Sequence, residues 1–413
     1  MARQRTPTVL VAGAGTVGLA VAALLATGRC ADRLRVQVLE ARPLPRWRPE
    51  DTDLRVYALS RASQRLLDAL GVWQRVAAAR ASPYRRMRVW EGADPSGPAS
   101  VEFDCADIAE PDLGHIVEDN LLRTVLADVV TAAPNAELAI GGSITALDVG
   151  RRGVTARLGN GGTAQGALVV AADGSASALR ALLDLPVAAR SYDQTAIVTH
   201  VASALPHRET AWQRFLSGGP LAFLPLADGR SSVVWSLPAA RAAELLAASD
   251  SDFLAALQDA SAGVLGALEH GAPRAGFPLQ ALHALRYCTA RAALVGDAAH
   301  TIHPLAGQGM NLGLLDAAAL ATTIEDAVLA GEDPGDRKVL RRYERERKGD
   351  NLQMLVALDA LQRLFGLPAW AAPIRSAGLG AVNSSAAAKR LFMERALRLN
   401  AGSKNRLGWS HAT

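Results

Sequence analysis

Residues 9–18, Val9-Leu10-Val11-Ala12-Gly13-Ala14-Gly15-Thr16-Val17-Gly18, contain the sequence pattern that is most informative about the fold. Its first four residues form an apolar, largely β-branched run that predicts a buried strand, and the glycines that follow have the spacing G-x-G-x-x-G. Gly13 permits a tight turn, Gly15 lets a phosphate approach the backbone, and Gly18 lets a helix pack closely on the strand. The stretch therefore predicts an α/β fold with a dinucleotide-binding turn.

The residues after this turn supply the context that such a site requires. Residues 19–27 have the pattern of a helix, and 34–39 read as a second strand that closes on Glu40. A carboxylate at that strand end can accept hydrogen bonds from ribose hydroxyls, although a solvated acid is the alternative interpretation. The candidate cofactor-binding residues of this unit are Gly13, Ala14, Gly15, Gly18, Glu40, Ala41 and Arg42.

Two further strands end in turns that contain glycine. The apolar run 167–172 ends at Asp173-Gly174, and the run 292–295 leads into Gly296–Gly313, ahead of a helical pattern over 314–330. In open α/β sheets, ligands bind outside the carboxyl ends of the strands. Because the three turns are far apart in sequence, we expect one interleaved nucleotide-binding domain with a second domain inserted into it.

The Gly296–Gly313 segment offers several groups to a ligand. Asp297 can hydrogen-bond a hydroxyl, and the backbone of Gly307-Gln308-Gly309, just ahead of a helix, can present N–H groups. His300 and His303 could assist proton transfer, but we favour the interpretation that they support the loop by hydrogen bonds. His303 is therefore only a weak candidate for a catalytic residue, and the acid or base of any reaction stays unknown.

A cationic candidate lies between the first turn and the next predicted helix. Arg55 belongs to an Asp53-x-Arg55 pair and precedes Ser60, the expected N-cap of a helix over 61–70. The arginine fork can make two charge-assisted bonds to a pyrophosphate. Without this context, Arg55 would be interpreted as an ordinary surface arginine.

The middle of the chain reads as an antiparallel sheet with helices. The predicted strands are 191–203, 210–216, 221–226 and 231–237. Helices are predicted over 239–248 and 252–268, and the chain is helical after residue 337. Such a sheet would cover a ligand and form a substrate cavity.

The composition restricts the classes of protein to which this chain can belong. The 413-residue chain is 50% hydrophobic and 20% charged with a net charge of +4, which fits a globular protein without a nucleic-acid partner, built of two domains or of one elaborated α/β domain. Cys30, Cys105 and Cys288 are scattered, so we expect neither a disulfide framework nor a metal site. Residues 1–5 run straight into a strand, and no apolar run reaches the about 18–20 residues that span a bilayer. We expect a cytoplasmic protein that contacts the inner face of a membrane at most.

Together these motifs resemble the class A flavoprotein monooxygenases, and within them the aerobic ubiquinone-biosynthesis hydroxylases. The resemblance rests on the G-x-G-x-x-G turn with Glu40, Asp53-x-Arg55, Ala172-Asp173-Gly174, Gly219–Leu226, Gly296–Gly313 and Tyr343-Glu344-Arg345-x-Arg347. It implies FAD as cofactor, NAD(P)H as reductant and O₂ as co-substrate, with a flavin C4a-hydroperoxide that hydroxylates the ring of a hydrophobic prenylated phenol. Membership of a ubiquinone-biosynthesis complex and the oligomeric state stay open.

The resemblance also implies roles for single residues. The first turn and Glu40 would hold the ADP half of FAD, Arg55 the pyrophosphate and Asp297 the ribityl chain, while Asp173-Gly174 would pack beneath the cofactor. The candidates outside the first unit are Arg55, Asp173, Gly174, Gly296, Asp297, Pro304, Gly307, Gln308, Gly309, Asn311 and Leu312. The chain departs from its relatives at Asp119, where they carry a neutral or basic side chain.

The predicted architecture is a Rossmann-like FAD-binding domain interleaved with an α+β substrate domain and followed by a helical tail. The expected FAD-binding domain comprises residues 1–75, 145–185 and 285–340, with 76–144 as connecting segment, 186–284 as substrate domain and 341–413 as helical region. Two alternatives stay open: a class A monooxygenase acting on another phenolic or secondary-metabolite substrate, and a non-catalytic flavoprotein-like scaffold of a biosynthetic complex.

Overall fold

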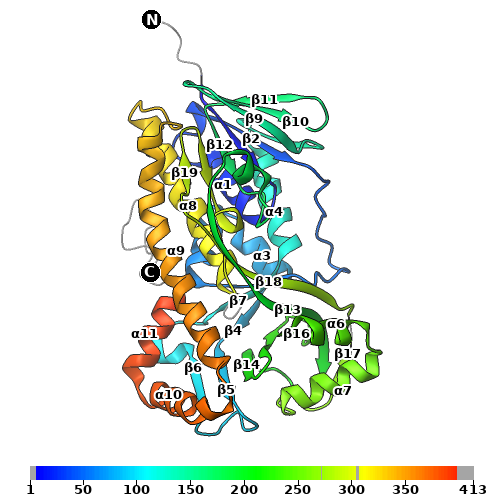
Figure 1. Ribbon diagram of the computed structural model, residues 1–413. Helices are drawn as coiled ribbons and strands as arrows, with labels where there is room; N and C mark the ends of the chain where they lie inside the picture. The colour runs from blue at the N-terminus through cyan, green and yellow to red at the C-terminus, as the bar shows by residue number, and fades with distance from the viewer. Residues whose placement is uncertain (1–5, 271, 304–306, 398–413) are drawn as a thin grey trace, which may run out of the picture.

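A computed structural model describes residues 6–270, 272–303 and 307–397, and its first large sheet has six strands in the order β19-β20-β12-β1-β2-β8 (Figure 1). The strands are β1 (Thr8–Ala12), β2 (Arg35–Glu40), β8 (Ala136–Ile140), β12 (Leu168–Ala171), β19 (Cys288–Thr289) and β20 (Ala292–Leu294). All pairs are parallel except β19 with β20. The predicted parallel α/β sheet is confirmed, and its strands are apolar because helices and a further sheet cover them.

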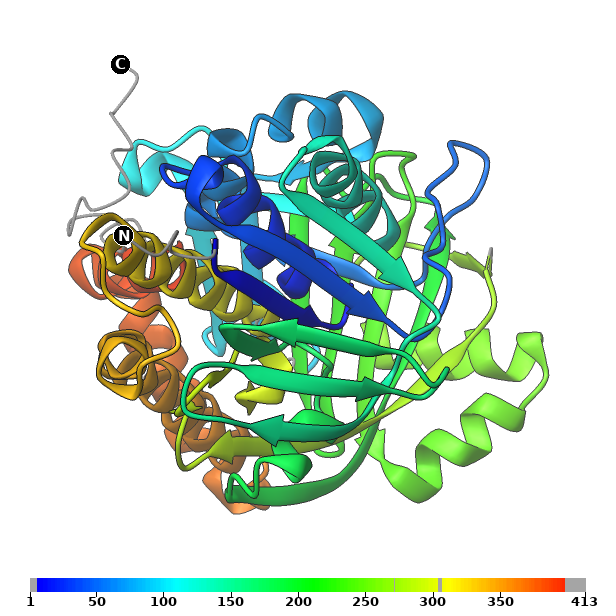
Figure 2. The same ribbon diagram turned by 90° about the horizontal axis from the view of Figure 1, so that it is seen from above.

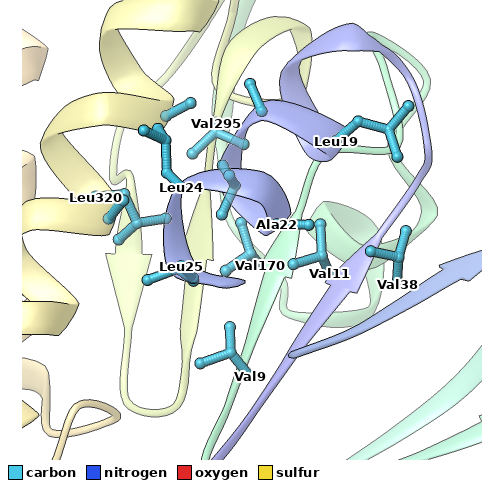
Figure 3. Packing of buried hydrophobic residues seen from close by; sticks show 14 of the residues in the cluster. Val9, Val11, Leu19, Ala22, Leu24, Leu25, Val38, Val170, Val295 and Leu320 are labelled. Carbon is cyan, nitrogen blue, oxygen red and sulfur yellow. The ribbon is translucent and has the colours of Figure 1, made fainter. Parts of the chain in front are cut away.

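Helix α1 (Thr16–Thr27) is buried along almost its whole length. Figure 3 shows its apolar side chains between the strands, which contribute Val11 and Val170, and helix α8 (Gln308–Leu329), which contributes Leu320. A helix that is apolar all round belongs in a core rather than at a surface. Helix α4 (Asp119–Ala132) packs beside α1 as well.

The second large sheet has nine strands, and its main path runs β21-β18-β13-β16-β15-β14-β5-β6. The strands are β5 (Arg86–Glu91), β6 (Ser100–Asp104), β13 (Val187–Ser203), β14 (Thr210–Leu216), β15 (Gly219–Pro225), β16 (Ser231–Pro238), β17 (Leu268–His270), β18 (Ala275–Ala284) and β21 (His300–Thr301). The four strands predicted for the middle of the chain are confirmed, and β13, β16, β15 and β14 are joined antiparallel. Helices α6 (Ala239–Ala247) and α7 (Asp250–Ser261) cover one face.

Two small sheets and three short helices complete the connections. The strands are β3 (Val56–Leu59), β4 (Ser82–Tyr84) and β7 (Gly114–Glu118) in one sheet, and β9 (Ile144–Val149), β10 (Val154–Leu158) and β11 (Thr163–Gly166) in the other. The helices are α2 (Arg61–Ala69), α3 (Trp73–Arg80) and α5 (Ala178–Leu182). Ser60 caps α2 as expected, since its side chain accepts from the Ser63 amide at 3.4 Å.

The described part of the C-terminal region is helical, as the sequence predicts. It contains α9 (Arg337–Phe365), α10 (Ala372–Ser384) and α11 (Ala386–Leu397). Helix α9 runs from the six-stranded half to the nine-stranded half (Figure 1) and packs against α8. Figure 2 shows α8 and α9 at one flank of the molecule and α6 and α7 at the opposite flank.

Two predicted helix boundaries were wrong. The helix expected over 252–268 ends at Ser261, because Ala262, Gly263 and Gly266 have left-handed φ angles of 55°, 66° and 71°. The helix expected from residue 314 begins at Gln308, directly after Gly307 with φ of 60°. A glycine-rich segment has poor helix propensity, but here close packing outweighs it: a Cβ on Gly313 would lie 2.6 Å from the Val17 side chain.

Candidate functional site

A cavity of about 990 Å³ lies between the carboxyl ends of the six-stranded sheet and one face of the nine-stranded sheet. Its volume is at the upper end of the range of about 300–1,000 Å³ for small-molecule sites. The predicted site residues that line it are Gly13, Gly15, Glu40, Ala41, Arg42, Arg55, Asp173, Gly174, Asp297, Gly307 and Gly309. The structure thus brings the three glycine-containing turns to one place.

Other predicted site residues lie behind this lining. They are Ala14, Gly18, Gly296, Gln308, Asn311 and Leu312, while Pro304 falls outside the described residues. Asn311 is buried, accepts from the Ser60 amide at 2.8 Å and donates to the Ala58 carbonyl at 2.9 Å, which joins α8 to the start of α2. Leu312 is buried in a separate hydrophobic cluster. Both residues therefore support the structure behind the cavity and do not line it.

The first turn has the close contacts that its glycines predict. Gly13 has φ of 99°, and a Cβ there would lie 2.4 Å from the Ala172 carbonyl oxygen. A Cβ on Gly18 would lie 2.1 Å from the Gly13 carbonyl oxygen, whereas one on Gly15 would meet no atom within 4 Å. The space beside Gly15, next to the N-terminus of α1, is therefore open to a group that approaches the backbone, and a helix N-terminus favours an anion.

Glu40 is held at the end of β2 by two backbone amides. Its Oε2 accepts from the Ala14 amide at 2.7 Å and its Oε1 from the Arg42 amide at 3.0 Å. Each carboxylate oxygen can accept more than one hydrogen bond, so both remain able to accept from hydroxyl groups of a ligand in the cavity.

Arg55 supplies a cation to the cavity. Among the described residues its guanidinium makes no hydrogen bond or ion pair, and it lies 5.5 Å from the centre of the Phe277 ring. The Asp53 carboxylate fixes the backbone ahead of it by accepting from the amides of Arg55 and Asn120, each at 3.0 Å. The site therefore has a positioned cation that no protein anion neutralises by direct contact.

A second arginine at this wall was not predicted from the sequence. Arg123 lies one helical turn after Asp119 on α4, lines the cavity, and its Nε donates to the Ala14 carbonyl at 3.3 Å. Asp119 accepts from the Thr16 hydroxyl at 2.7 Å, so the residue that departs from the family pattern joins α4 to α1. The i, i+4 spacing of these two charges on an amphipathic helix is a signal that could have indicated the contact.

Asp173 and Asp297 occupy the other two turns. Asp173 accepts from the Ser177 hydroxyl at 2.5 Å and the Leu179 amide at 3.1 Å, and so stabilises the start of α5. The Asp297 side chain opens onto the cavity. Desolvation by the surrounding chain raises the pKa of its carboxyl group, although His300 and Arg55 favour the charged form. The Asp297 carboxylate oxygens can accept hydrogen bonds from a ligand in the cavity.

A buried polar network supports the segment around Asp297 from behind. Asp316 on α8 is 0% exposed, and its Oδ2 lies 2.5 Å from His300 Nε2 and accepts from the Gly296 amide at 3.2 Å. Its Oδ1 accepts from Arg347 Nε and Asn351 Nδ2, each at 2.9 Å, both on α9. Burial raises the pKa of Asp316, but His300 and Arg347, with the Asn351 amide, outweigh burial and lower this pKa to about 2.

This network connects two motifs of the sequence, Tyr343-Glu344-Arg345-x-Arg347 and the Gly296–Gly313 segment. Arg347 reaches Asp316, and the buried Tyr343 hydroxyl donates to the Leu294 carbonyl at 2.7 Å. The role of His300 as a support was predicted, but Asp316 and Asn351 were not. In the sequence, Asp316 and Asn351 lie within ordinary helical patterns. Their hydrogen-bond partners belong to segments far away in the chain, so the local pattern does not reveal these contacts.

His303 does not line the cavity. Its Nε2 lies 3.3 Å from the Gln194 side-chain oxygen, and its ring contacts Tyr192 edge-on at 4.9 Å. Burial lowers the pKa of His303 to about 4. This position suits a residue that supports the loop better than one that exchanges protons with a ligand.

The nine-stranded sheet forms the opposite wall, which the sequence analysis did not resolve into residues. A row of residues paired across β14, β15, β16 and β13 faces the cavity: Gln213, Ala222, Val234 and Val198. The alternate residues Trp212 and Arg214 face α7 instead, where Arg214 donates to the Ala260 carbonyl at 2.7 Å. Apart from Gln213, this row consists of small apolar side chains.

Residues 6–355 match the family described as FAD binding domain. The crystal structure of PqsL from P. aeruginosa in complex with 2-aminobenzoylacetate has a TM-score of 0.75 and 26% sequence identity, and the match covers 90% of this chain and 99% of that chain. Fold and site thus define an FAD-dependent monooxygenase, with NAD(P)H and O₂ as the reductant and co-substrate of the class.

Two relatives narrow the class. The chain is 38% identical over 390 residues to the ubiquinone hydroxylase UbiL of Rhodospirillum rubrum, covering 94% of this chain and 89% of that protein. It is 37% identical over 397 residues to the 3-demethoxyubiquinol 3-hydroxylase of Escherichia coli, covering 95% and 98%. The chain belongs to the ubiquinone-biosynthesis hydroxylase family of FAD-dependent monooxygenases.

Proposed function

We propose that this protein hydroxylates the aromatic ring of a polyprenylated phenol in ubiquinone biosynthesis. The observation that carries the proposal is one cavity with two unlike walls, a polar, glycine-rich wall and an apolar sheet wall. The first suits a dinucleotide, and the second suits an apolar ring with a prenyl tail. The names of the two relatives support this class of substrate.

The polar wall would hold FAD as follows. The open backbone at Gly15 and the Arg55 guanidinium would bind the pyrophosphate, Glu40 the ribose, and Asp297 the ribityl chain. When bound, FAD supplies the activation of O₂ and the transfer of one oxygen atom to the ring. We assign this wall to an FAD-binding domain built on the six-stranded sheet, and the opposite wall to a substrate domain built on the nine-stranded sheet.

The chain's own contribution would be to position the ring and to exclude water. Ala222, Val234 and Val198 would place an apolar face against the substrate, and their small side chains would leave room for it. Holding the ring in reach of the reacting cofactor converts an encounter into a unimolecular step. Excluding water protects reactive intermediates from hydrolysis.

Deletion of the gene followed by mass spectrometry of the accumulating quinone precursors tests this function. The expected result is a prenylated phenol that lacks one hydroxyl group, with restoration of quinone by the wild-type gene. Unchanged quinone, together with turnover of a soluble phenol by the purified protein, would favour the alternative monooxygenase. A protein that purifies colourless and binds no added FAD would indicate a scaffold instead.

We further propose that the C-terminal helices contact a membrane surface, where a polyprenylated substrate dissolves. Trp370, Ile374, Leu391 and Phe392 are 70%, 65%, 54% and 51% exposed, on neighbouring elements η5 (Ala369–Ala371), α10 and α11. No helix in the described part of the chain is long and apolar enough to cross a membrane. Flotation with phospholipid vesicles should be lost in a Trp370→Asp/Phe392→Asp variant that still binds FAD, and equal flotation of both proteins would contradict the contact.

A further inference from the structure

Gln213 interrupts an otherwise apolar row. Its register partners are Ala222 on β15 and Val89 on β5, and Ala222 in turn pairs with Val234, which pairs with Val198. Directly paired residues lie on the same face of a sheet. The carboxamide therefore lies on the face that forms the cavity wall, and Gln213 is one of the lining residues.

The Gln213 side chain is buried and lacks a protein partner. It is 7% exposed, and among the described residues its carboxamide makes no hydrogen bond. Its neighbour Arg214 on β14 shows the contrast, since its guanidinium donates to the backbone carbonyls of Gly92, Asp259 and Ala260. Side-chain amides with little exposure are normally hydrogen-bonded, so one without a protein partner in a cavity wall points to a ligand.

The chemistry of the carboxamide restricts what that ligand offers. A glutamine side chain has two N–H donors and one oxygen acceptor, so it can accept from a phenolic O–H and donate to a carbonyl or ether oxygen. The carboxamide carries no charge and therefore does not neutralise a carboxylate on a ligand. Ala222, Val234 and Val198 beside it leave an apolar surface for the ring itself.

We propose that Gln213 is a specificity-determining residue that hydrogen-bonds an oxygen substituent of the substrate ring and so selects phenols over unsubstituted rings. This inference rests on the proposed function, because it concerns the substrate side of the same cavity. A site built to pair with a hydroxyl rejects the analogue that lacks it, since the buried amide is then left without a partner.

Two probes that differ by one hydroxyl test the inference: 2-geranylphenol and geranylbenzene. Their dissociation constants for the FAD-loaded full-length protein can be measured from the change in the flavin absorption spectrum. We expect the wild type to bind the phenol at least about tenfold more tightly, the factor that one hydrogen bond of about 1.4 kcal/mol supplies. In Gln213→Leu the ratio should fall to near one, with little loss of affinity for geranylbenzene.

Gln165→Leu is the matched control, because Gln165 is an exposed glutamine on β11, outside the cavity. It should keep the wild-type ratio. If Gln213→Leu does not retain FAD, Gln213→Met, which keeps the chain length, is measured in its place with the same expected ratio.

The outcomes separate this inference from the proposed function. A wild-type ratio in the Gln213 variant, or an equal loss of affinity for both probes, would overturn the role of Gln213 and leave the function intact. Equal affinity of the wild-type protein for both probes would likewise overturn the role of Gln213 and leave the function intact. Wild-type protein that binds neither probe would overturn the proposed function and the role of Gln213 together.

Discussion

At the polar wall of the cavity, one added carbon on Gly18 would lie 2.1 Å from a backbone oxygen, while at the sheet wall the side chains of Ala222 and Val234 border open space. The polar wall depends on close backbone approach, which few substitutions tolerate. The sheet wall depends on which side chains face inward. We therefore expect changes at the first wall to remove the cofactor and the fold, and changes at the second to alter the substrate.

Gly18→Val should have the largest effect. The added side chain would overlap the Gly13 carbonyl and force α1 away from β1, with a loss of stability at or above the usual range of about 1–3 kcal/mol for overpacking. The measurement is the yield of soluble protein with bound FAD. Gly15→Ala is the control, because its Cβ meets no protein atom within 4 Å; it should fold and only bind FAD more weakly. A yellow Gly18→Val protein with the wild-type thermal midpoint would contradict the expectation.

Arg347→Met should come next, because it breaks the network behind the polar wall. Asp316 would keep its buried charge and its contact with His300 but lose its ion pair with Arg347, and removing one partner of a buried pair costs about 3–5 kcal/mol. Denaturant unfolding of the FAD-loaded protein measures the change. Arg345→Met, at an exposed position of the same helix, is the control and should be near neutral. Equal unfolding of the two variants would show that the ion pair does not support this wall.

Ala222→Leu addresses the sheet wall and should leave the fold intact. The larger side chain would project into the cavity, so FAD content should stay near wild type while 2-geranylphenol binds about tenfold or more weakly, the loss expected for about 1.4 kcal/mol. Ala189→Leu, at an exposed position on β13, is the control. Loss of FAD in the Ala222 variant would show that the two walls are not separable.

Acid should weaken the sheet side in a graded way. His200 on β13, His283 on β18 and His303 after β21 are buried, and burial lowers the pKa of each from 6.5 to about 4. Between these values the unfolded chain binds more protons than the folded chain, so stability is retained above about pH 6.5 and falls as the pH drops towards 4. Thermal midpoints at pH 7.5, 6 and 5 measure this fall, which should be shallower in His303→Gln. A constant midpoint over this range would contradict it.

Most of the polar wall, with Arg123 as the exception, could be predicted from the sequence alone. The positions of β1, β2, β12 and β20 and the glycine spacing of the first turn are local properties, because a tight turn needs φ angles and close approaches that only certain residues allow. For the same reason Gly13, Glu40, Asp173 and Asp297 were predictable as lining residues.

The sheet wall and the contacts that support the polar wall depend instead on how distant segments meet in the folded chain. Whether Gln213 or Trp212 faces the cavity depends on register across several strands, and a shift of one residue would exchange them. Likewise, Asp316 meets Arg347 and His300 only because α8, α9 and β21 converge, and nothing local to a helix reveals such a partner. Local chemistry can be read from a motif, whereas the choice of inward-facing residue and the pairing of buried charges depend on contacts between distant segments.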